Sequence, residues 1–236
     1  MKPRPRITLV SGQLLTAQCW APQVAALSRD YDLRHADHSQ DDTISGMAAR
    51  LLAQNPEPFD LVAHAMGGFV AFEVLRRSPE RVRSLVLIAS LASADGPAQT
   101  ERRQGYIRLV EAGNFAGVVE ERIPILVHPA RREDAPLLST VRQMAQSTGP
   151  EVFLAQQRAI MGRIDSRPFL KDIACPVLLI RGRQDGVTTQ DHQDEILAQI
   201  PHARSETLDH AGHLATLERP ESVSALLSDW LGAQNR

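Results

Sequence analysis

The sequence is poor in cysteine and in aromatic residues, and it has no long apolar run. Two cysteines and 4% aromatic residues occur among 236 positions. Cys19 and Cys175 are far apart and lie in apolar surroundings, which favours buried thiols over a disulfide. No apolar run is long enough to span a bilayer, and ITLV behind the basic start MKPRPR is too short for a signal-peptide core. These absences predict a cytoplasmic protein without a membrane partner.

A large net charge and metal-binding motifs are also missing. The 26 basic and 28 acidic residues nearly cancel, so nothing in the charge balance would recruit a nucleic acid or an anionic membrane. No cysteine or histidine spacing typical of a metal site occurs, and no metal is expected. The length is sufficient for one substantial core. The sequence carries no signal for the oligomeric state.

Short apolar runs alternate with helical patterns along most of the chain. Bounded runs of this kind are typical of strands that are buried on both faces of a parallel sheet. Their alternation with helices predicts the α/β class, with an open, mostly parallel sheet and helices on both faces. The predicted strands are Ile7–Val10, Tyr31–Ala36, Phe59–Ala63, Val82–Ile88, Val177–Ile180 and Ala203–Leu208.

One segment interrupts this alternation. Residues 92–165 contain helical patterns and several prolines but no convincing strand. This predicts a helical insertion into a core made of residues 1–91 and 166–236. An insertion behind the carboxyl end of a strand lies over the ligand crevice of an open α/β sheet, so we interpret it as a lid. The alternative is an extra helical layer with no role in binding.

The segment FDLVAHAMGGFVAFEVL, residues 59–75, predicts a strand, a tight turn and a helix. Turns of this shape usually carry a nucleophilic serine at the apex, as in G-x-S-x-G, but here the apex is Ala65. A residue with a Cβ is strained at such an apex by roughly 1–2 kcal/mol, which is reasonable only if its side chain has a function. Glycine would fit a purely structural turn better. We therefore interpret Ala65 as the position of a removed nucleophile.

A nucleophile at position 65 would need an acid and then a histidine later in the chain. Asp185 follows the predicted strand Val177–Ile180, and His213 lies in a turn behind the last predicted strand. The carboxylate would orient the imidazole, which would accept the serine proton and return it to the leaving group. The order and the context of these residues, more than either residue alone, indicate a catalytic triad.

Other residues compete for these roles. His210 is a second candidate for the base, and Asp95, just beyond the strand Val82–Ile88, is a second candidate for the acid. We interpret Asp37 as a loop carboxylate. His64 precedes the apex, so we expect it to point away from the site and into the packing of the turn.

The remaining requirement is an oxyanion hole, which needs two backbone N–H donors aimed at the developing negative oxygen. Met66 follows the apex at the start of a helix, whose dipole adds to the effect. The second donor should come from the loop LVSGQLLTAQCW behind the first strand, where Gln13 is the first choice and Leu14 the second. The alternative is an ordinary loop in which Gly12 merely makes the turn.

Taken together, these motifs resemble those of the α/β-hydrolases of the small esterase type. The resemblance covers nearly the whole chain and rests on SGQLLTAQCW, AHAMGG, GRQDGVTT and AGHLATLERPE. Family members commonly have H-G-x, G-H-S-M-G-G and G-H-x-x-x-x-E-x-P at the first, second and last of these places. This chain departs at Ser11, Ala63 and Ala65, where a histidine, a glycine and the nucleophilic serine are usual. Because Ile7–Val10 is the first strand run, the resemblance implies about six strands, without the family's first antiparallel ones.

The resemblance implies hydrolysis of a carboxylic ester, a lactone or a thioester through an acyl-enzyme, with no cofactor. A small ester-like molecule would bind between the turn and the lid. No cluster of arginines is recognisable, which favours a small, mostly apolar substrate. The apolar face of an inserted helix more often packs than lines a pocket, so several of the candidate pocket residues should belong to the core. These candidates are Leu14, Phe115, Val119, Ile123, Leu126, Phe153, Ile160 and Met161.

Three explanations of Ala65 are open from the sequence. The first is an engineered Ser-to-Ala substitution that keeps a bound substrate intact. The second is a natural ligand-binding homologue that has kept the pocket and lost the chemistry. The third is base chemistry by His213 and Asp185 without serine, as in a lyase or a cofactor-free oxygenase, since one fold hosts many reactions.

Overall fold

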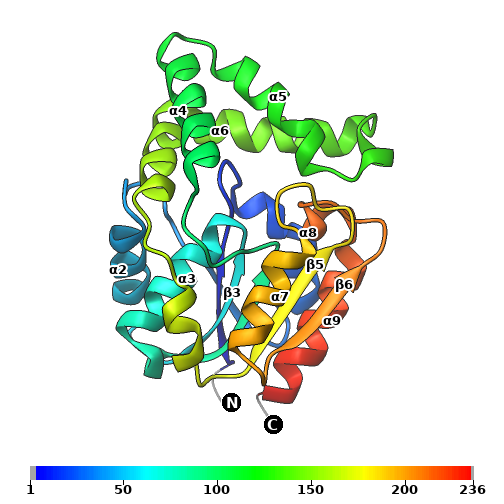
Figure 1. The fold of residues 1–236 in the computed structure, drawn as a ribbon. Coiled ribbons are helices and arrows are strands. Elements are labelled where there is room, and N and C mark those ends of the chain that lie inside the picture. Colours follow the sequence, from blue (N-terminus) through cyan, green and yellow to red (C-terminus); the bar gives the residue numbers. More distant parts are fainter. Residues whose placement is uncertain (1–3, 235–236) are drawn as a thin grey trace.

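A computed structural model describes residues 4–234, so residues 1–3 and 235–236 of the predicted core segments lie outside the described part. Six strands form one sheet in the order β2-β1-β3-β4-β5-β6, and every pairing is parallel (Figure 1). The predicted fold class is confirmed, and each predicted strand is present. The strands are β1 Arg6–Val10, β2 Asp32–His35, β3 Phe59–His64, β4 Val82–Ile88, β5 Val177–Gly182 and β6 Arg204–Leu208.

The strand order places a switch point between β1 and β3. From β1 the chain turns outward to β2, then returns beside β1 as β3 and continues in the opposite direction across the sheet. Every residue of β3 and β5 is buried, as expected of strands that are covered on both faces. In an open α/β sheet the ligand crevice lies outside the carboxyl ends of the strands at such a switch point. The loops behind β1 and β3 are therefore the first place to look for a site.

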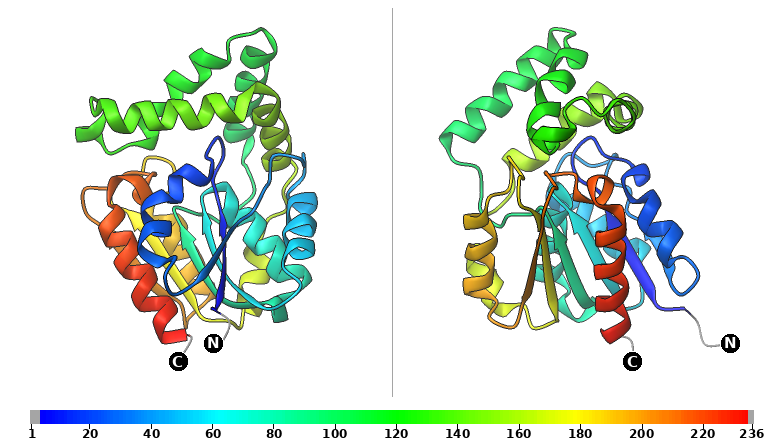
Figure 2. Two further views of the ribbon diagram at one scale, coloured as in Figure 1. Left: turned by 180° about the vertical axis from the view of Figure 1, so that it is seen from behind. Right: turned by 90° about the vertical axis from the view of Figure 1, so that its right-hand side faces the viewer.

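Helices cover both faces of the sheet, as Figure 2 shows with α7 and α9 on opposite sides. One face carries α1 Ala21–Leu27 and α9 Pro220–Gln234. Both helices contribute to the first apolar cluster, which includes Trp20 and Leu227. The other face carries α2 Ile44–Gln54, α3 Met66–Arg77 and α7 Gln190–Gln199, which belong to a second cluster. The shorter helical elements are η1 Ala17–Trp20, η2 Pro79–Arg81, η3 Pro129–Arg131, η4 Arg167–Asp172 and α8 Ala215–Glu218.

Three helices lie above the carboxyl ends of the strands (Figure 1). They are α4 Pro97–Glu111, α5 Phe115–Leu126 and α6 Ala135–Met161, and no strand occurs in residues 92–165. α6 bends at Gly149, whose φ of 80° is outside the helical region and is followed by Pro150. Helices without a strand thus occupy the segment in which the sequence predicts the insertion. Its function as a lid stays a prediction.

Both cysteines are free, with Cys19 buried and Cys175 half-buried. No helix within residues 4–234 is long and apolar enough to cross a membrane.

Candidate active site

The turn between β3 and α3 has the geometry of a nucleophile elbow. Its apex, Ala65, has φ 49° and ψ −113°, a conformation that residues with a Cβ rarely adopt. The apex N–H donates to the oxygen of Ile88 on β4 at 2.9 Å. A Cβ at Gly67 would lie 2.5 Å from the oxygen of Val10, so only glycine lets the helix press this close to the sheet. The strain and the close approach together hold the side chain of residue 65 above the sheet.

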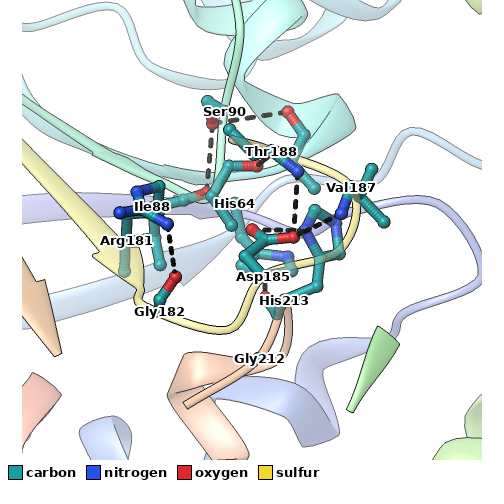
Figure 3. Close-up of polar contacts among 12 residues, drawn as sticks. His64, Ile88, Ser90, Arg181, Gly182, Asp185, Val187, Thr188, Gly212 and His213 are labelled. Carbon is teal, nitrogen blue, oxygen red and sulfur yellow. Dashed lines mark hydrogen bonds and ion pairs between the residues drawn. The ribbon is translucent and has the colours of Figure 1, made fainter. Parts of the chain in front are cut away.

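Asp185 and His213 meet at the adjacent strand ends. The Nδ1 atom of His213 lies 2.9 Å from Oδ2 and 3.1 Å from Oδ1 of Asp185. The same carboxylate accepts the N–H groups of Val187 and Thr188 at 2.8 and 2.9 Å (Figure 3). Burial acts to raise the pKa of Asp185, but His213 and these donors outweigh it and lower the pKa. The carboxylate therefore stays charged and holds the proton of His213 on Nδ1, which leaves Nε2 free to act as a base.

The competing candidates contact other residues. His210 is exposed, and its ring lies 6.0 Å from that of His128, measured between centroids. The carboxylate of Asp95 is engaged by Arg103 and Arg163 at 2.5 and 2.8 Å. Asp37 accepts bonds from neighbouring side chains in its own exposed loop. Of the acids considered, only Asp185 bonds to His213.

His213 is also held through its backbone. Its N–H donates to the oxygen of Leu126 at the end of α5, at 2.9 Å. Its carbonyl oxygen lies 2.8 Å from Nε2 of His64. The expectation that His64 points away from the site needs a correction. The side chain is fully buried, yet it packs on His213 and borders the cavity described below.

Two backbone N–H groups are available for an oxyanion. Within residues 4–234, neither Gln13 nor Met66 donates its backbone N–H to a protein acceptor. Met66 is the first residue of α3, where no intrahelical acceptor exists. The N–H of Leu14, in contrast, is bonded to Oε1 of Gln156 at 3.1 Å. This favours Gln13 over Leu14 as the donor from the first loop.

A cavity of about 140 Å³ lies between the elbow and the helical layer, and Ala65, His213, Gln13 and Met66 all line it. One water molecule needs about 10–15 Å³ of such volume, so the cavity has room for a small organic group. No three His, Cys, Asp or Glu side chains of the described residues are grouped so as to hold a metal ion.

Two of the eight candidate pocket residues, Leu126 and Ile160, line this cavity. The other six predictions are corrected. The inward faces of α5 and α6 pack against each other, so that the rings of Phe115 and Phe153 lie 5.8 Å apart between centroids. These side chains fill a core and do not face the ligand crevice. The corrected residues are Leu14, Phe115, Val119, Ile123 and Phe153, which belong to or pack on one apolar cluster, and Met161, which is half-buried outside the cavity.

Sequence reasoning missed the basic wall of the cavity. The expectation that the chain has no arginine cluster is wrong, because four arginines line the cavity together: Arg102, Arg103, Arg122 and Arg163. Only Arg102 and Arg103 are adjacent in the sequence. Arg122 comes from another helix and Arg163 from the segment behind α6. Tertiary packing brings them together, and no sequence spacing announces it.

Comparisons with known proteins agree with this geometry. A family model described as "Alpha/beta hydrolase family" matches residues 8–226. A protein of Pseudomonas savastanoi pv. phaseolicola named "Putative carbamate hydrolase RutD" is 28% identical, over 98% of this chain and 95% of that protein. A pimeloyl-[acyl-carrier protein] methyl ester esterase of Nitrosomonas europaea is 26% identical, over 92% of each chain. The malate-bound structure of a thermophilic esterase from Thermogutta terrifontis superposes with a TM-score of 0.92 at 25% identity, over 99% of this chain and 92% of that one.

Proposed function

The chain belongs to the alpha/beta hydrolase family, and from this premise we propose that its cavity is a serine esterase site with alanine at the nucleophile position. One observation carries the proposal. Ala65 adopts a φ of 49°, a strained conformation for a residue with a Cβ, at the apex of the turn between β3 and α3. The names of the relatives, a methyl ester esterase and a carbamate hydrolase, support a hydrolase that attacks a carbonyl carbon.

With serine at position 65, the proposed reaction has two halves. His213 accepts the hydroxyl proton while the oxygen attacks the ester carbonyl, and Asp185 stabilises the imidazolium that forms. The N–H groups of Gln13 and Met66 bind the oxyanion. The imidazolium then protonates the leaving alcohol. In the second half His213 takes a proton from water as the water oxygen attacks the acyl-enzyme, and the imidazolium returns this proton to the serine oxygen as the acid is released.

The helical insertion acts in this proposal as a lid over a small ester-like substrate. Its residues Leu126 and Ile160 line the cavity beside the base. The oxygen of Leu126 accepts the N–H of His213 at 2.9 Å, which links the insertion to the site. The proposed reaction needs no cofactor.

With Ala65, no acyl-enzyme can form. Loss of a triad serine costs on the order of 10⁶ in turnover, so an ester bound in this chain would persist. A further candidate function, base chemistry without serine, is favoured by the intact pair of Asp185 and His213. The remaining candidate function, ligand binding without chemistry, keeps the same cavity and makes no use of the pair.

The test is to replace Ala65 with serine and to measure hydrolysis of p-nitrophenyl esters from acetyl to octanoyl. We expect a gain of at least about a thousandfold for Ala65→Ser. The gain should vanish in Ala65→Ser/His213→Ala. Ala94→Ser is the matched control, because it puts a serine on the lining of the same cavity but outside the elbow turn.

A fluorophosphonate probe should label Ala65→Ser and leave Ala94→Ser unlabelled. If the probe labels neither protein, the esterase proposal fails. Turnover of a ligand by the chain with Ala65, lost in His213→Ala, would instead support base chemistry without serine. Binding without turnover in every variant would support the binding protein.

A further inference from the structure

Part of the cavity wall is strongly basic. Arg102 and Arg103 come from α4, Arg122 from α5 and Arg163 from the segment behind α6, and all four line the cavity. Among the described lining residues, Asp95 is the one carboxylate. The cavity therefore holds more positive charge than its own acidic side chain can balance.

Asp95 forms ion pairs with two of these arginines. Its Oδ2 atom lies 2.5 Å from Nε of Arg103, and its Oδ1 atom lies 2.8 Å from Nη2 of Arg163. Arg163 also donates to the oxygen of Ser93 and stacks on the ring of Phe69, with 4.2 Å from its guanidinium carbon to the ring centroid. These two guanidinium groups are held in place and have no need of a ligand.

Arg122 is different. Its Nη1 atom is buried and has no hydrogen-bond partner within residues 4–234, although its side chain lines the cavity. Its guanidinium carbon lies 5.5 Å from the ring centroid of Phe153, and none of the described acidic side chains forms an ion pair with it. Burial, together with the nearby charge of Arg103, lowers the pKa of Arg122 to about 10. The group is thus charged at neutral pH, in surroundings that penalise the charge.

A buried cation without a partner is costly unless an anion completes it. Arg102 adds a second charge on the same wall, and none of the described residues pairs with it. A planar guanidinium binds a carboxylate through two parallel hydrogen bonds. The wall therefore offers a free donor pair and excess positive charge to a ligand.

The position of Arg122 on α5 indicates how far a bound anion would lie from His213. Leu126, whose oxygen binds the N–H of His213, follows Arg122 by one helical turn on α5. Four residues of α-helix rise about 6 Å along the axis. An anion on Arg122 would thus sit a short aliphatic spacer away from the group that reacts at His213, in a cavity that Leu126 and Ile160 also line.

We propose that Arg122, assisted by Arg102, binds a carboxylate of the substrate, so that the natural ligand is a half-ester of a dicarboxylic acid or a comparable acidic ester. This inference rests on the proposed function for the reacting end of the ligand. The acidic end rests on the arginine wall alone. It replaces the small, mostly apolar substrate that the sequence favours.

The experiment measures equilibrium binding to the chain as it stands, with Ala65, by titration calorimetry. The probes are monomethyl adipate, which carries one carboxylate, and dimethyl adipate, which has the same chain and no charge. We expect the half-ester to bind roughly ten- to a hundredfold more tightly than the diester at low salt, as a charge-assisted pair would give. Added salt should weaken binding of the half-ester and leave the diester unchanged.

The variants then locate the effect. Arg122→Gln should weaken the half-ester by roughly ten- to a hundredfold and leave the diester unchanged, and Arg122→Lys should recover part of the loss. Arg108→Gln is the matched control, because Arg108 is an exposed arginine of α4 that pairs with Glu101 outside the cavity. Circular dichroism checks that each variant is folded.

Equal affinity of the unmodified chain for the two probes would overturn the inference, and this comparison needs no variant. Equal losses for both probes in Arg122→Gln would also overturn it. Hydrolysis by Ala65→Ser is a separate readout. If Ala65→Ser is inactive but the half-ester is still preferred, the proposed function fails and the anion site stands. If Ala65→Ser is active but the half-ester is not preferred, the anion site fails and the proposed function stands.

Discussion

The ring of His64 lies against that of His213, with 5.2 Å between the ring centroids, and its Nε2 atom is 2.8 Å from the backbone oxygen of His213. A carbonyl oxygen can only accept, so Nε2 of His64 carries the proton. Its Nδ1 atom is buried without a partner within residues 4–234. Burial, and next the charge of a protonated His213, lower the pKa of His64 to about 4. His64 is therefore neutral and packs against the loop that carries His213.

This arrangement predicts how stability depends on pH. The unfolded chain protonates residue 64 near its ordinary pKa of 6.5, whereas the folded chain resists until about pH 4. Between these values the unfolded state binds more protons, so the free energy of unfolding falls as the pH drops from 6.5 to about 4. The loss from this one group should approach about 3 kcal/mol. Urea denaturation at a series of pH values measures it.

The matched variants are His64→Gln and His202→Gln, the second at an exposed histidine that binds the oxygen of Cys175. His64→Gln should flatten the decline, and His202→Gln should leave it as it is. His38 is also buried, which lowers its pKa, so its own part of the decline should remain in every protein. An equally steep decline in His64→Gln and in the unmodified chain would contradict the assignment to His64.

A second prediction concerns the acid. In the Ala65→Ser background, Asp185→Asn should lower the turnover number by about 10⁴-fold at neutral pH, because an amide favours the wrong tautomer of His213. Ester hydrolysis measures the effect. Asp209→Asn is the control, since Asp209 is exposed and pairs with Arg183 on the surface. A loss of less than about tenfold would show that Asp185 does not orient the base.

The turn at Ala65 and the meeting of Asp185 with His213 could be predicted from the sequence because each signal is local, and their catalytic role stays a prediction. An elbow needs a strand, a small residue before the apex and glycines behind it, and these lie together at Ala63, Gly67 and Gly68. Asp185 and His213 each follow a strand, and parallel strands end at one edge of the sheet. Local signals together with one topological rule were therefore sufficient.

The pocket wall could not be predicted in this way. Phe153 and Ile123 lie on apolar helix faces, and a hydrophobic pattern does not tell whether such a face meets another helix or a ligand. Arg122 could not be predicted to line a cavity, because an isolated arginine in a helix usually faces solvent. Its meaning depends on the crossing of α4 and α5, which side-chain packing decides.

A third prediction tests the close approach at the elbow. Gly67→Ala places a Cβ 2.5 Å from the oxygen of Val10, so α3 must shift, and the free energy of unfolding should fall by about 1–3 kcal/mol. Gly105→Ala is the matched control inside α4, where the new Cβ meets only Nη2 of Arg108 at 3.9 Å. That change should raise stability by up to about 1 kcal/mol, because alanine favours helix. Losses of equal size in both variants would argue against crowding as the cause.

The last prediction concerns a carboxylate that bonds both to the segment behind α5 and to the loop of His213. Glu218 is 5% exposed, its Oε1 atom accepts the N–H of His128 at 2.5 Å, and its Oε2 atom accepts that of Gly212 at 2.8 Å. His128 follows α5, and Gly212 directly precedes His213. Glu218 therefore joins the segment behind α5 to the segment that carries His213.

Glu218→Gln leaves one acceptor oxygen and turns an NH₂ group toward a backbone donor. We expect a loss of about 1–3 kcal/mol in the free energy of unfolding, since one buried N–H is left without an acceptor. In the Ala65→Ser background the turnover number should fall more than the affinity for the ester, because the base moves while Arg122 and the oxyanion donors stay. Glu221→Gln, an exposed change in the first turn of α9, is the control. Unchanged turnover in Glu218→Gln, with the stability loss present, would confine Glu218 to a structural role.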